Sequence, residues 1–479
     1  MNIVDIVYFW ARTMPERPAV IQPDIILSYR ILVEGIEKAA QYFAWNIRDT
    51  SKPVTVSVNS NPRMLVASLG LLRAGFSIVV ASRPDIASIA PDESPFLVIE
   101  RGEAPLGDRT CLFFDDSWIS SGAAAPQPGS LPPQPRARDV EVFFYTSGST
   151  GRPKRIVRNQ QAFDLRVLFN SNMAFVNYER ALILTGLSNS MGFTRAYETL
   201  YFGKTICFAP VGEPMLRLAN TFDIDIIFAS PQQALQLAEL QQKVANYPLT
   251  ALKAIMLGGA VLSPDGIRRI QNYLCRNIII TYSSTETGVV ATAPYDMIAH
   301  IPSAVGFLTP EAEAQIVDVS GKILPPGAEG LVRLRTRQYL VNFGIDDPNA
   351  WYHPGDVGSL TSDGVLCIAG RKDTVLNRGG TKLSIEDLEQ FMRSCPGVKD
   401  AGACSAMTAA GFEEVWVGLV LEPSADVGAL RAAIDGNTNF AGNIDKIFVV
   451  ETIPRGQLGK VQREEFKTML REISDGSAS

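Results

Sequence analysis

Residues 140–154 read VEVFFYTSGSTGRPK, an apolar run that passes into a loop of small and hydroxylated residues. The alternation over 140–144 predicts a strand entering a sheet. The next ten residues contain four serine or threonine hydroxyls, two glycines and a closing lysine, Lys154. Nothing bulky shields the backbone there, so such a loop can bring N–H groups, hydroxyls and a positive charge to one anion. The stretch is therefore either a phosphate cradle or a flexible solvent loop.

Two common nucleotide-binding motifs are absent from the sequence. Neither Gly148 nor Gly151 begins the pattern G-x-x-x-x-G-K-[ST], which excludes a P-loop NTPase. No G-x-G-x-x-G accompanies a strand and helix, so a dinucleotide-binding fingerprint is excluded as well. If the loop binds phosphate, it belongs to another class of nucleotide site.

Size and composition narrow the class of protein. A chain of 479 residues suggests two or three domains, and 46% hydrophobic with 20% charged residues is typical of a globular protein. The net charge of −6 argues against nucleic acid as the main partner. Six scattered cysteines without a C-x-x-C pair indicate reduced thiols, and two histidines make a transition-metal site improbable. Without a signal peptide or an uninterrupted apolar run of membrane length, we expect a cytoplasmic protein with no membrane span.

The hydrophobic pattern alternates between strands and helices, which predicts an α/β fold with a largely parallel sheet. Before the loop, helices are predicted over 3–12, 30–46 and 63–73, strands over 19–21, 25–29, 54–58 and 76–81, and a linker over 121–136. After it, strands are predicted over 180–185, 205–208, 224–228, 254–257 and 278–281, and helices over 159–173, 193–202, 215–220 and 264–274. Residues 315–336 alternate like a smaller β subdomain, and the last 110 or so residues predict a compact α+β module.

Five further motifs follow the loop in a fixed order. They are YSSTE at 282–286, YHPGD at 352–356, GRKD at 370–373, NRGGTK at 377–382 and PRGQLGK at 454–460. Together with LSY at 27–29 and LLRAG at 71–75, the set resembles the adenylate-forming superfamily of acyl-CoA synthetases, peptide-synthetase adenylation domains and beetle luciferases. The resemblance extends over nearly the whole chain, and it is closest to the acyl-CoA synthetases.

The resemblance implies an architecture and a reaction. Residues 1–371 would form a large ATP- and acyl-binding domain of mainly parallel sheets, and residues 372–479 a small mobile α+β lid that rotates near Asp373. The reaction would join a carboxylic acid to ATP, giving acyl-AMP and pyrophosphate, and a thiol would then take the acyl group. ATP, Mg²⁺ and CoA are the implied cofactor and co-substrates, and an acyl carrier protein is a possible partner in place of CoA.

The resemblance also assigns roles to residues. The phosphate loop would comprise Thr146, Ser147, Gly148, Ser149, Thr150, Gly151 and Lys154. The nucleotide would lie against Gly259, Ala260, Tyr282, Ser283 and Ser284, with its ribose on Asp356 and Arg371. Glu286 would hold Mg²⁺ with Thr146, beside Thr285, because this ion prefers carboxylate and phosphate oxygens. Lys460 would bridge the α-phosphate and the substrate carboxylate, which lowers the repulsion between two anions.

Each of these residues also has a plain structural interpretation. Glu286 and Lys460 could be solvated surface charges, Tyr282 a core tyrosine and Asp356 a turn residue. Two positions depart from the family pattern, which usually has Thr at Pro354 and Gly at Arg155. The first affects a local turn, and the second affects the flexibility of the phosphate loop.

The acid and its acceptor are less well defined by the sequence. The acyl pocket is expected around Asn189, Ser190, Gly258 and Gly288, and residues 187–193 lack the aspartate of many amino-acid-activating relatives. Arg195 could pair with a second carboxylate, or it could be an exposed helical arginine. Arg378, Gly379 and Gly380 are expected at the CoA tunnel. The three candidate functions are an acyl-CoA synthetase, an enzyme that loads a carrier protein, and a non-catalytic nucleotide-binding regulator.

Overall fold

Strand β7 (Val142–Thr146) of the computed structural model is the strand predicted ahead of the loop, and it runs two residues further than expected. It lies in a six-stranded sheet of order β6-β5-β3-β4-β7-β8, in which only the β7–β8 pair is antiparallel. The other strands are β3 (Val54–Val56), β4 (Ile78–Val80), β5 (Phe96–Glu100), β6 (Thr110–Phe114) and β8 (Lys154–Arg158). Thr146 pairs with Lys154, so the two ends of the phosphate loop are joined by a hairpin.

The structure describes residues 4–49, 51–106, 108–114, 140–146, 154–172, 177–244, 246–259, 264–371, 375–378, 381–407, 413–437, 440, 444–456 and 459–476. Several predictions lie outside these ranges. They are the linker over 121–136, the loop residues Ser147, Gly148, Ser149, Thr150 and Gly151, and Ala260, Asp373, Gly379 and Gly380.

The N-terminal helices follow from their sequence pattern. They are α1 (Asp5–Thr13), α2 (Tyr29–Asn46) and α3 (Asn61–Arg73), with the short 3-10 helix η1 (Pro84–Ser88) after β4. The Ser28 hydroxyl caps α2 by accepting from the Ile31 N–H, and the apolar stripe of this helix is buried as its spacing predicts. Gly70 allows close packing of α3 on α2, because a Cβ there would lie 2.5 Å from the Cβ of Ala39.

The second sheet has thirteen strands, and a run of six parallel strands lies toward one of its edges. These are β1 (Pro18–Gln22), β10 (Thr205–Cys207), β9 (Arg180–Ile183), β11 (Ile226–Ala229), β12 (Ala254–Gly258) and β13 (Ile278–Ser284), with β2 (Ile25–Ser28) antiparallel at the edge. The accompanying helices are α4 (Gln160–Asn172), α5 (Ser190–Tyr201), α6 (Glu213–Thr221), α7 (Pro231–Val244) and α8 (Pro264–Tyr273). The carboxyl ends of β11, β12 and β13 therefore meet at one edge of the sheet.

The predicted β subdomain is continuous with this sheet, because β14 pairs with both β13 and β15. Its elements are β14 (Gly288–Pro294), α9 (Tyr295–Ile298), β15 (Ala304–Leu308), β16 (Ala312–Val317), β17 (Gly330–Thr336), α10 (Arg337–Phe343), β18 (Asp356–Leu360) and β19 (Val365–Arg371). Strands β14 to β19 pair antiparallel, so they extend the parallel region by hairpin connections.

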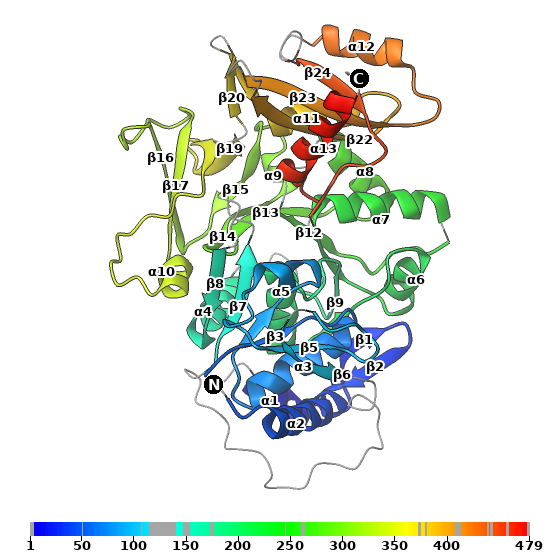
Figure 1. Cartoon of the computed structure of the whole chain (residues 1–479), viewed down its shortest axis with the longest axis vertical. Helices are drawn as coiled ribbons and strands as arrows, with labels where there is room; N and C mark the ends of the chain where they lie inside the picture. The colour runs from blue at the N-terminus through cyan, green and yellow to red at the C-terminus, as the bar shows by residue number, and fades with distance from the viewer. Residues whose placement is uncertain are drawn as a thin grey trace.

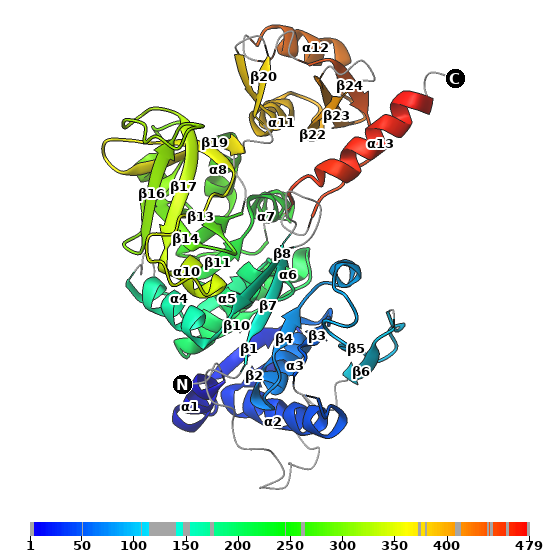
Figure 2. The same cartoon turned by 60° about the vertical axis from the view of Figure 1, so that its left-hand side comes forward.

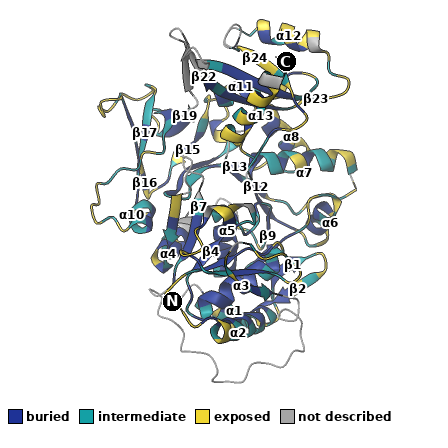
Figure 3. Ribbon diagram, in the orientation of Figure 1, coloured by how far each residue is buried: buried dark blue, intermediate teal, exposed yellow. Residues whose placement is uncertain are grey.

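The C-terminal part has its own small sheets and core, and it lies at one end of the molecule in both views (Figures 1 and 2). Its elements are β20 (Val375–Arg378), β21 (Thr381–Ser384), α11 (Ile385–Ser394), β22 (Val398–Met407), β23 (Glu413–Leu421), α12 (Val427–Asp435), β24 (Lys446–Val449) and α13 (Arg463–Gly476). Figure 3 shows buried residues along the strands and exposed residues on outer helices such as α12. The predicted α/β class with a smaller C-terminal unit is confirmed, while the boundary at 371/372 stays a prediction.

Some predicted elements need correction. Tyr282, Ser283 and Ser284 lie inside β13 rather than after it. Strands β5 and β6 and helix α7 were not predicted at all. Among the described helices, none combines the length and apolar character that crossing a membrane requires.

Candidate active site

The turn between β13 and β14 carries Thr285 and Glu286, and other elements hold its backbone. The Asn342 amide of α10 donates to the carbonyl of Glu286 at 2.7 Å and to that of Thr285 at 3.3 Å. The Arg158 guanidinium of β8 also donates to the Thr285 carbonyl, at 3.2 Å. Because these donors fix the turn, the Glu286 carboxylate has a defined position. Neither Asn342 nor Arg158 belongs to a recognisable motif, and the sequence did not single them out.

Two further side chains lie around Glu286. The Tyr352 hydroxyl bonds to the Glu286 carboxylate, and the pKa of this tyrosine is raised, mainly by burial and then by that negative charge. The Lys154 ammonium lies 4.6 Å from the Phe343 ring centroid and 5.6 Å from that of Tyr352. The hairpin of the phosphate loop and the turn of Glu286 thus meet at the same place, as the predicted phosphate and Mg²⁺ roles require.

Asp356, Tyr282 and Arg371 form a second group next to the first. The Tyr282 hydroxyl donates to the Asp356 carboxylate, and Arg371 is the strand partner of Asp356 across β18 and β19. Burial raises the pKa of Asp356, whereas the Tyr282 hydrogen bond and the charges of Arg371 and Lys460 lower it. Arg371 donates to the Pro354 carbonyl at 3.1 Å, so the departure at Pro354 leaves Asp356 at the start of its strand.

Lys460 comes from the C-terminal part of the chain and lies near this second group. Its loop is closed by bonds from the Gly456 N–H to the Lys460 carbonyl and from the Gly459 N–H to the Gly456 carbonyl, both 2.8 Å. The side chain is open to solvent, yet the surrounding protein lowers the pKa of Lys460, as does Arg371, while Asp356 raises it. The structure therefore brings the C-terminal lysine beside residues about 100 positions earlier, which were predicted to bind the ribose.

The lysine loop also contacts the N-terminal part directly. Gly459 has a φ of +79°, and a Cβ at this residue would lie 1.7 Å from Oε1 of Gln232, in the first turn of α7. Arg455 holds the base of the loop, because it donates to the Gly459 carbonyl at 2.6 Å and pairs with Asp400. A side chain at this position would have to displace the Gln232 amide, and the positive φ by itself favours glycine.

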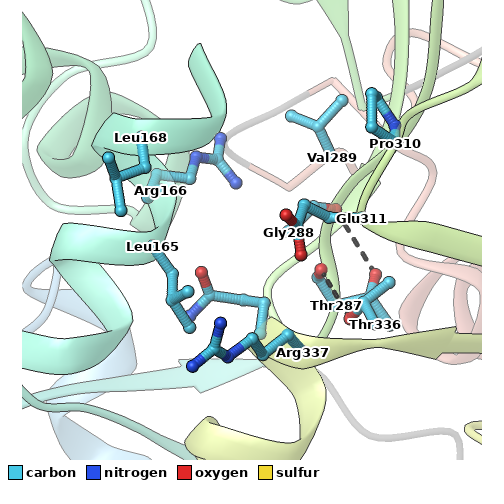
Figure 4. A pocket seen from close by; sticks show the side chains of 11 residues that line it. Leu165, Arg166, Leu168, Thr287, Gly288, Val289, Pro310, Glu311, Thr336 and Arg337 are labelled. Carbon is cyan, nitrogen blue, oxygen red and sulfur yellow. Dashed lines mark hydrogen bonds between the residues drawn. The ribbon is translucent and has the colours of Figure 1, made fainter. Parts of the chain in front are cut away.

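The acyl pocket predictions have mixed outcomes. Gly258 lines a cavity of about 10 Å³ at the carboxyl ends of β11, β12 and β13, together with Arg166, Met191, Arg195, Phe228, Ala229, Met256, Leu257, Thr281 and Ser283. Gly288 lines a neighbouring cavity of about 120 Å³ between α4 and the strands (Figure 4). Asn189 and Ser190 line neither of the two. Instead Asn189 caps α5 by accepting from the Gly192 N–H at 2.9 Å, which explains its position in structural terms.

The remaining predicted residues are placed as follows. Gly259 directly follows β12 and has a φ of +95°, a backbone conformation that favours glycine. Arg378 lies on the β20–β21 hairpin, opposite Thr381, and this hairpin is at the far end of the molecule from β7 and β8 (Figure 1). Within the described residues there is no cluster of three or more histidine, cysteine, aspartate or glutamate side chains that could hold a metal ion by themselves.

Comparison with known proteins gives the family. The family described as AMP-binding enzyme matches residues 8–340, which is more than half of the chain. The chain belongs to this family. The matched residues include the phosphate loop, the Glu286 turn and the strands that line both cavities.

Individual relatives of this AMP-binding enzyme are distant but extend over most of its length. A salicylyl-CoA synthase / salicylate adenylyltransferase of Streptomyces sp. is 24% identical over 97% of this chain and 93% of its own. A 4-chlorobenzoate–CoA ligase of Arthrobacter sp. is 26% identical over 70% of this chain and 67% of its own. The solved structure of the O-succinylbenzoate coenzyme A synthetase MenE of Bacillus subtilis with AMP matches 96% of this chain and 98% of that one, with a TM-score of 0.80 at 19% identity. The structural match shows that the fold is shared.

Proposed function

We propose that this enzyme is an ATP-dependent acid–thiol ligase, which converts a carboxylic acid to acyl-AMP and then to acyl-CoA. Family membership and the CoA-ligase names of the two sequence relatives support this reaction. The observation that carries it is the position of Lys460 beside Asp356 and Arg371. A cation from the C-terminal part thus lies where the ribose and α-phosphate of ATP are expected.

In the first step, an oxygen of the substrate carboxylate attacks the α-phosphorus of ATP, and pyrophosphate leaves. Because both reactants are anions, positioning and positive charge are the main contributions that the protein can make. Asp356 would hold the ribose hydroxyls, the loop from Thr146 to Lys154 the leaving phosphates, and Lys460 would bridge the carboxylate and the α-phosphate. In the second step, the deprotonated thiol attacks the acyl carbon, and AMP leaves.

The residues around Glu286 suit Mg²⁺, which binds in proteins through one or two carboxylates together with substrate phosphates. Glu286 offers a carboxylate on a turn that Asn342 fixes, and Thr146 lies at the end of the adjoining hairpin. Bound there, the ion would neutralise charge on the phosphates during the first step.

Two thiols are candidates for the acceptor of the acyl group. Free CoA and the phosphopantetheine of a carrier protein present the same reactive group, and the CoA-ligase relatives favour free CoA. In either case, we propose that residues 372–479 form the mobile lid and that the chain rotates near Asp373 between the two steps.

Pyrophosphate release on a panel of carboxylic acids, with and without CoA, tests this function. We expect release that depends on the acid, with CoA consumed in equal amount. Release without consumption of CoA would favour a carrier-protein acceptor. Tight ATP binding with no release for any acid would show that the protein is a nucleotide-binding regulator instead.

A further inference from the structure

Arg166 and Arg195 occupy one side of the acyl cavity, and both are buried, each with 7% of its surface exposed. The sequence-based interpretation of Arg195 as an exposed helical residue is therefore wrong. It fails because α5 is covered by helices α1 and α4 as well as by strands β9 and β10, so that residues 192–200 are all buried. Arg195 also lies over the Phe228 ring, 4.9 Å from the ring centroid.

A single glutamate pairs with both arginines. One oxygen of Glu198 accepts from Nε of Arg166 at 2.9 Å, and the other accepts from Nη1 of Arg195 at 2.8 Å. Within the described part of the chain, the other guanidinium nitrogens of these two arginines make no hydrogen bond to a protein group. Donors therefore remain available on each arginine next to the cavity.

The third arginine, Arg158, increases the positive charge of this interior. It is 3% exposed, it has no ionised group among its hydrogen-bond partners, and its Nε has no partner in the described residues. Burial and then the charge of Arg166 lower the pKa of Arg158 to about 9, although the charges of Glu198 and Glu286 act in the opposite direction. Three buried cations thus face one buried anion, Glu198, together with the half-buried Glu286 beside Arg158, so positive charge remains in excess among these described residues. An uncompensated charge in a protein interior is costly.

We propose that the acyl site takes a short carboxylic acid with a second carboxylate, and that Arg166 and Arg195 bind this second group. The inference rests on the proposed acid-activating function and names its class of substrate. Guanidinium forks match carboxylates in geometry, so a dicarboxylate would both use the available donors and offset the excess charge. One carboxylate would react at the α-phosphorus, while the other stays on the arginines.

The surroundings of the two arginines limit the length of the acid. The cavity beside Gly258 has about the volume of one water molecule, and the Met191 sulfur lies 3.6 Å from the point where a Gly258 Cβ would be. Arg166 also faces the larger cavity, where Gly288 leaves room for it: a Cβ there would lie 3.3 Å from Nη1 (Figure 4). A short chain would therefore enter the smaller cavity only if Met191 or Arg166 shifted from the position seen here.

Matched pairs of acids test this inference on the full-length enzyme. We would measure pyrophosphate release with succinate against butyrate, glutarate against valerate and phthalate against 2-methylbenzoate. We expect at least one dicarboxylate to exceed its partner about 100-fold in kcat/KM, because buried polar groups discriminate strongly against analogues that leave them unpaired. In Arg195→Gln this ratio should fall at least tenfold, mainly through the KM of the dicarboxylate.

Controls separate the possible outcomes. Arg73→Gln alters another arginine–glutamate pair between two helices, at 3.1 Å from Glu37, and should leave the ratio unchanged. AMP should raise the melting temperature of a correctly folded variant. If it does not do so for Arg195→Gln, Arg195→Lys is used instead, and it should lower the dicarboxylate-to-monocarboxylate ratio of kcat/KM by a smaller factor. Equal release from both members of every pair, or a ratio unaffected in the Arg195 variants, overturns the dicarboxylate inference alone. No release for any acid, despite AMP binding, overturns the proposed function as well.

Discussion

The residues around Lys460 act on its charge in opposite directions. Its side chain is open to solvent, and yet the nearby protein, including Arg371, makes its charge less favourable. Asp356 and Glu386 partly offset this effect. A lysine in such surroundings gains from the approach of two anions, which is what the adenylation step brings to it.

Replacement of this lysine should separate the two half-reactions. In Lys460→Ala, we expect acid-dependent ATP–pyrophosphate exchange to fall by about 10²- to 10³-fold, the usual effect of removing one preorganised electrostatic group. Thiolysis of preformed acyl-AMP should persist, because the proposed mechanism uses Lys460 in the first step only. Lys446→Ala, which changes an exposed lysine of the same module near Glu414, serves as the control. An exchange rate in Lys460→Ala equal to that of the unaltered protein would disprove the assignment.

The pH dependence of adenylation should report the same residue. Lys460 carries its charge below its pKa, and the surrounding protein lowers that pKa. The alkaline fall of kcat/KM, which reflects the free enzyme, should therefore begin at a lower pH than a solvated lysine would give. In Lys460→Arg the charge persists to higher pH. The alkaline fall of kcat/KM in that variant should therefore move to higher pH. A fall at the same pH in both proteins would assign the titration to another group.

Helix α10 is a short element whose main contribution is to hold the turn of Glu286. It begins at Arg337, where the Thr336 hydroxyl caps it by accepting from the Tyr339 N–H, and it ends at Gly344 with a φ of +59°. Between these caps, Asn342 points at the turn, and its amide also accepts from Gln338 at 3.0 Å. The position of the carboxylate predicted to hold Mg²⁺ thus depends on a helix outside every motif.

Loss of the Asn342 amide should raise the Mg²⁺ concentration that the reaction requires more than it raises the KM of the acid. In Asn342→Ala, two turn carbonyls lose a buried donor, which costs about 1–3 kcal/mol where no water replaces it. We expect pyrophosphate release to need about tenfold more Mg²⁺ for half-maximal rate, with an unchanged KM for the acid. Asn349→Ala, on an exposed loop near Arg335, should change neither value. An unchanged Mg²⁺ requirement in Asn342→Ala would leave Asn342 with a purely structural role.

The motifs could be located from sequence because each joins an irregular segment to a strand of strong hydrophobic pattern. The same reasoning missed α7, since its sequence is rich in glutamine and its buried face comprises only Pro231, Ala234, Leu237 and Ala238. It also missed Arg166 and Glu198, because a charged residue on a helix is exposed in most proteins. Their burial depends on how α4 and α5 pack together, which no local pattern contains.

At the scale of the whole molecule, the loop that carries Lys460 contacts a part of the chain that is distant in sequence. The lysine loop lies against α7, where the backbone of Gly459 approaches the side chain of Gln232. Arg455 and Asp400 attach the loop to the C-terminal sheet, so the loop and that sheet move as one body. If the lid rotates as proposed, this contact forms for adenylation and breaks for thiol transfer.

A methyl group at Gly459 should therefore block the first step selectively. Gly459→Ala places a Cβ within bonding distance of Gln232 and strains a backbone φ of +79°. We expect ATP–pyrophosphate exchange to fall at least tenfold, with thiolysis of acyl-AMP retained. The double variant with Gln232→Ala removes the overlap but keeps the strain, so it should recover part of the exchange. No recovery would mean that the backbone alone accounts for the loss.

Met191 and Gly258 have a consequence for how such an enzyme changes over generations. In the proposed acyl site, the thioether beside Gly258 would limit the room for the acid, whereas other residues would bind the second carboxylate and the nucleotide. A methionine codon is one nucleotide away from codons for leucine, valine, isoleucine and threonine. Single mutations can therefore resize the substrate site and leave the chemistry intact, which makes this position an economical starting point for directed evolution toward new acids.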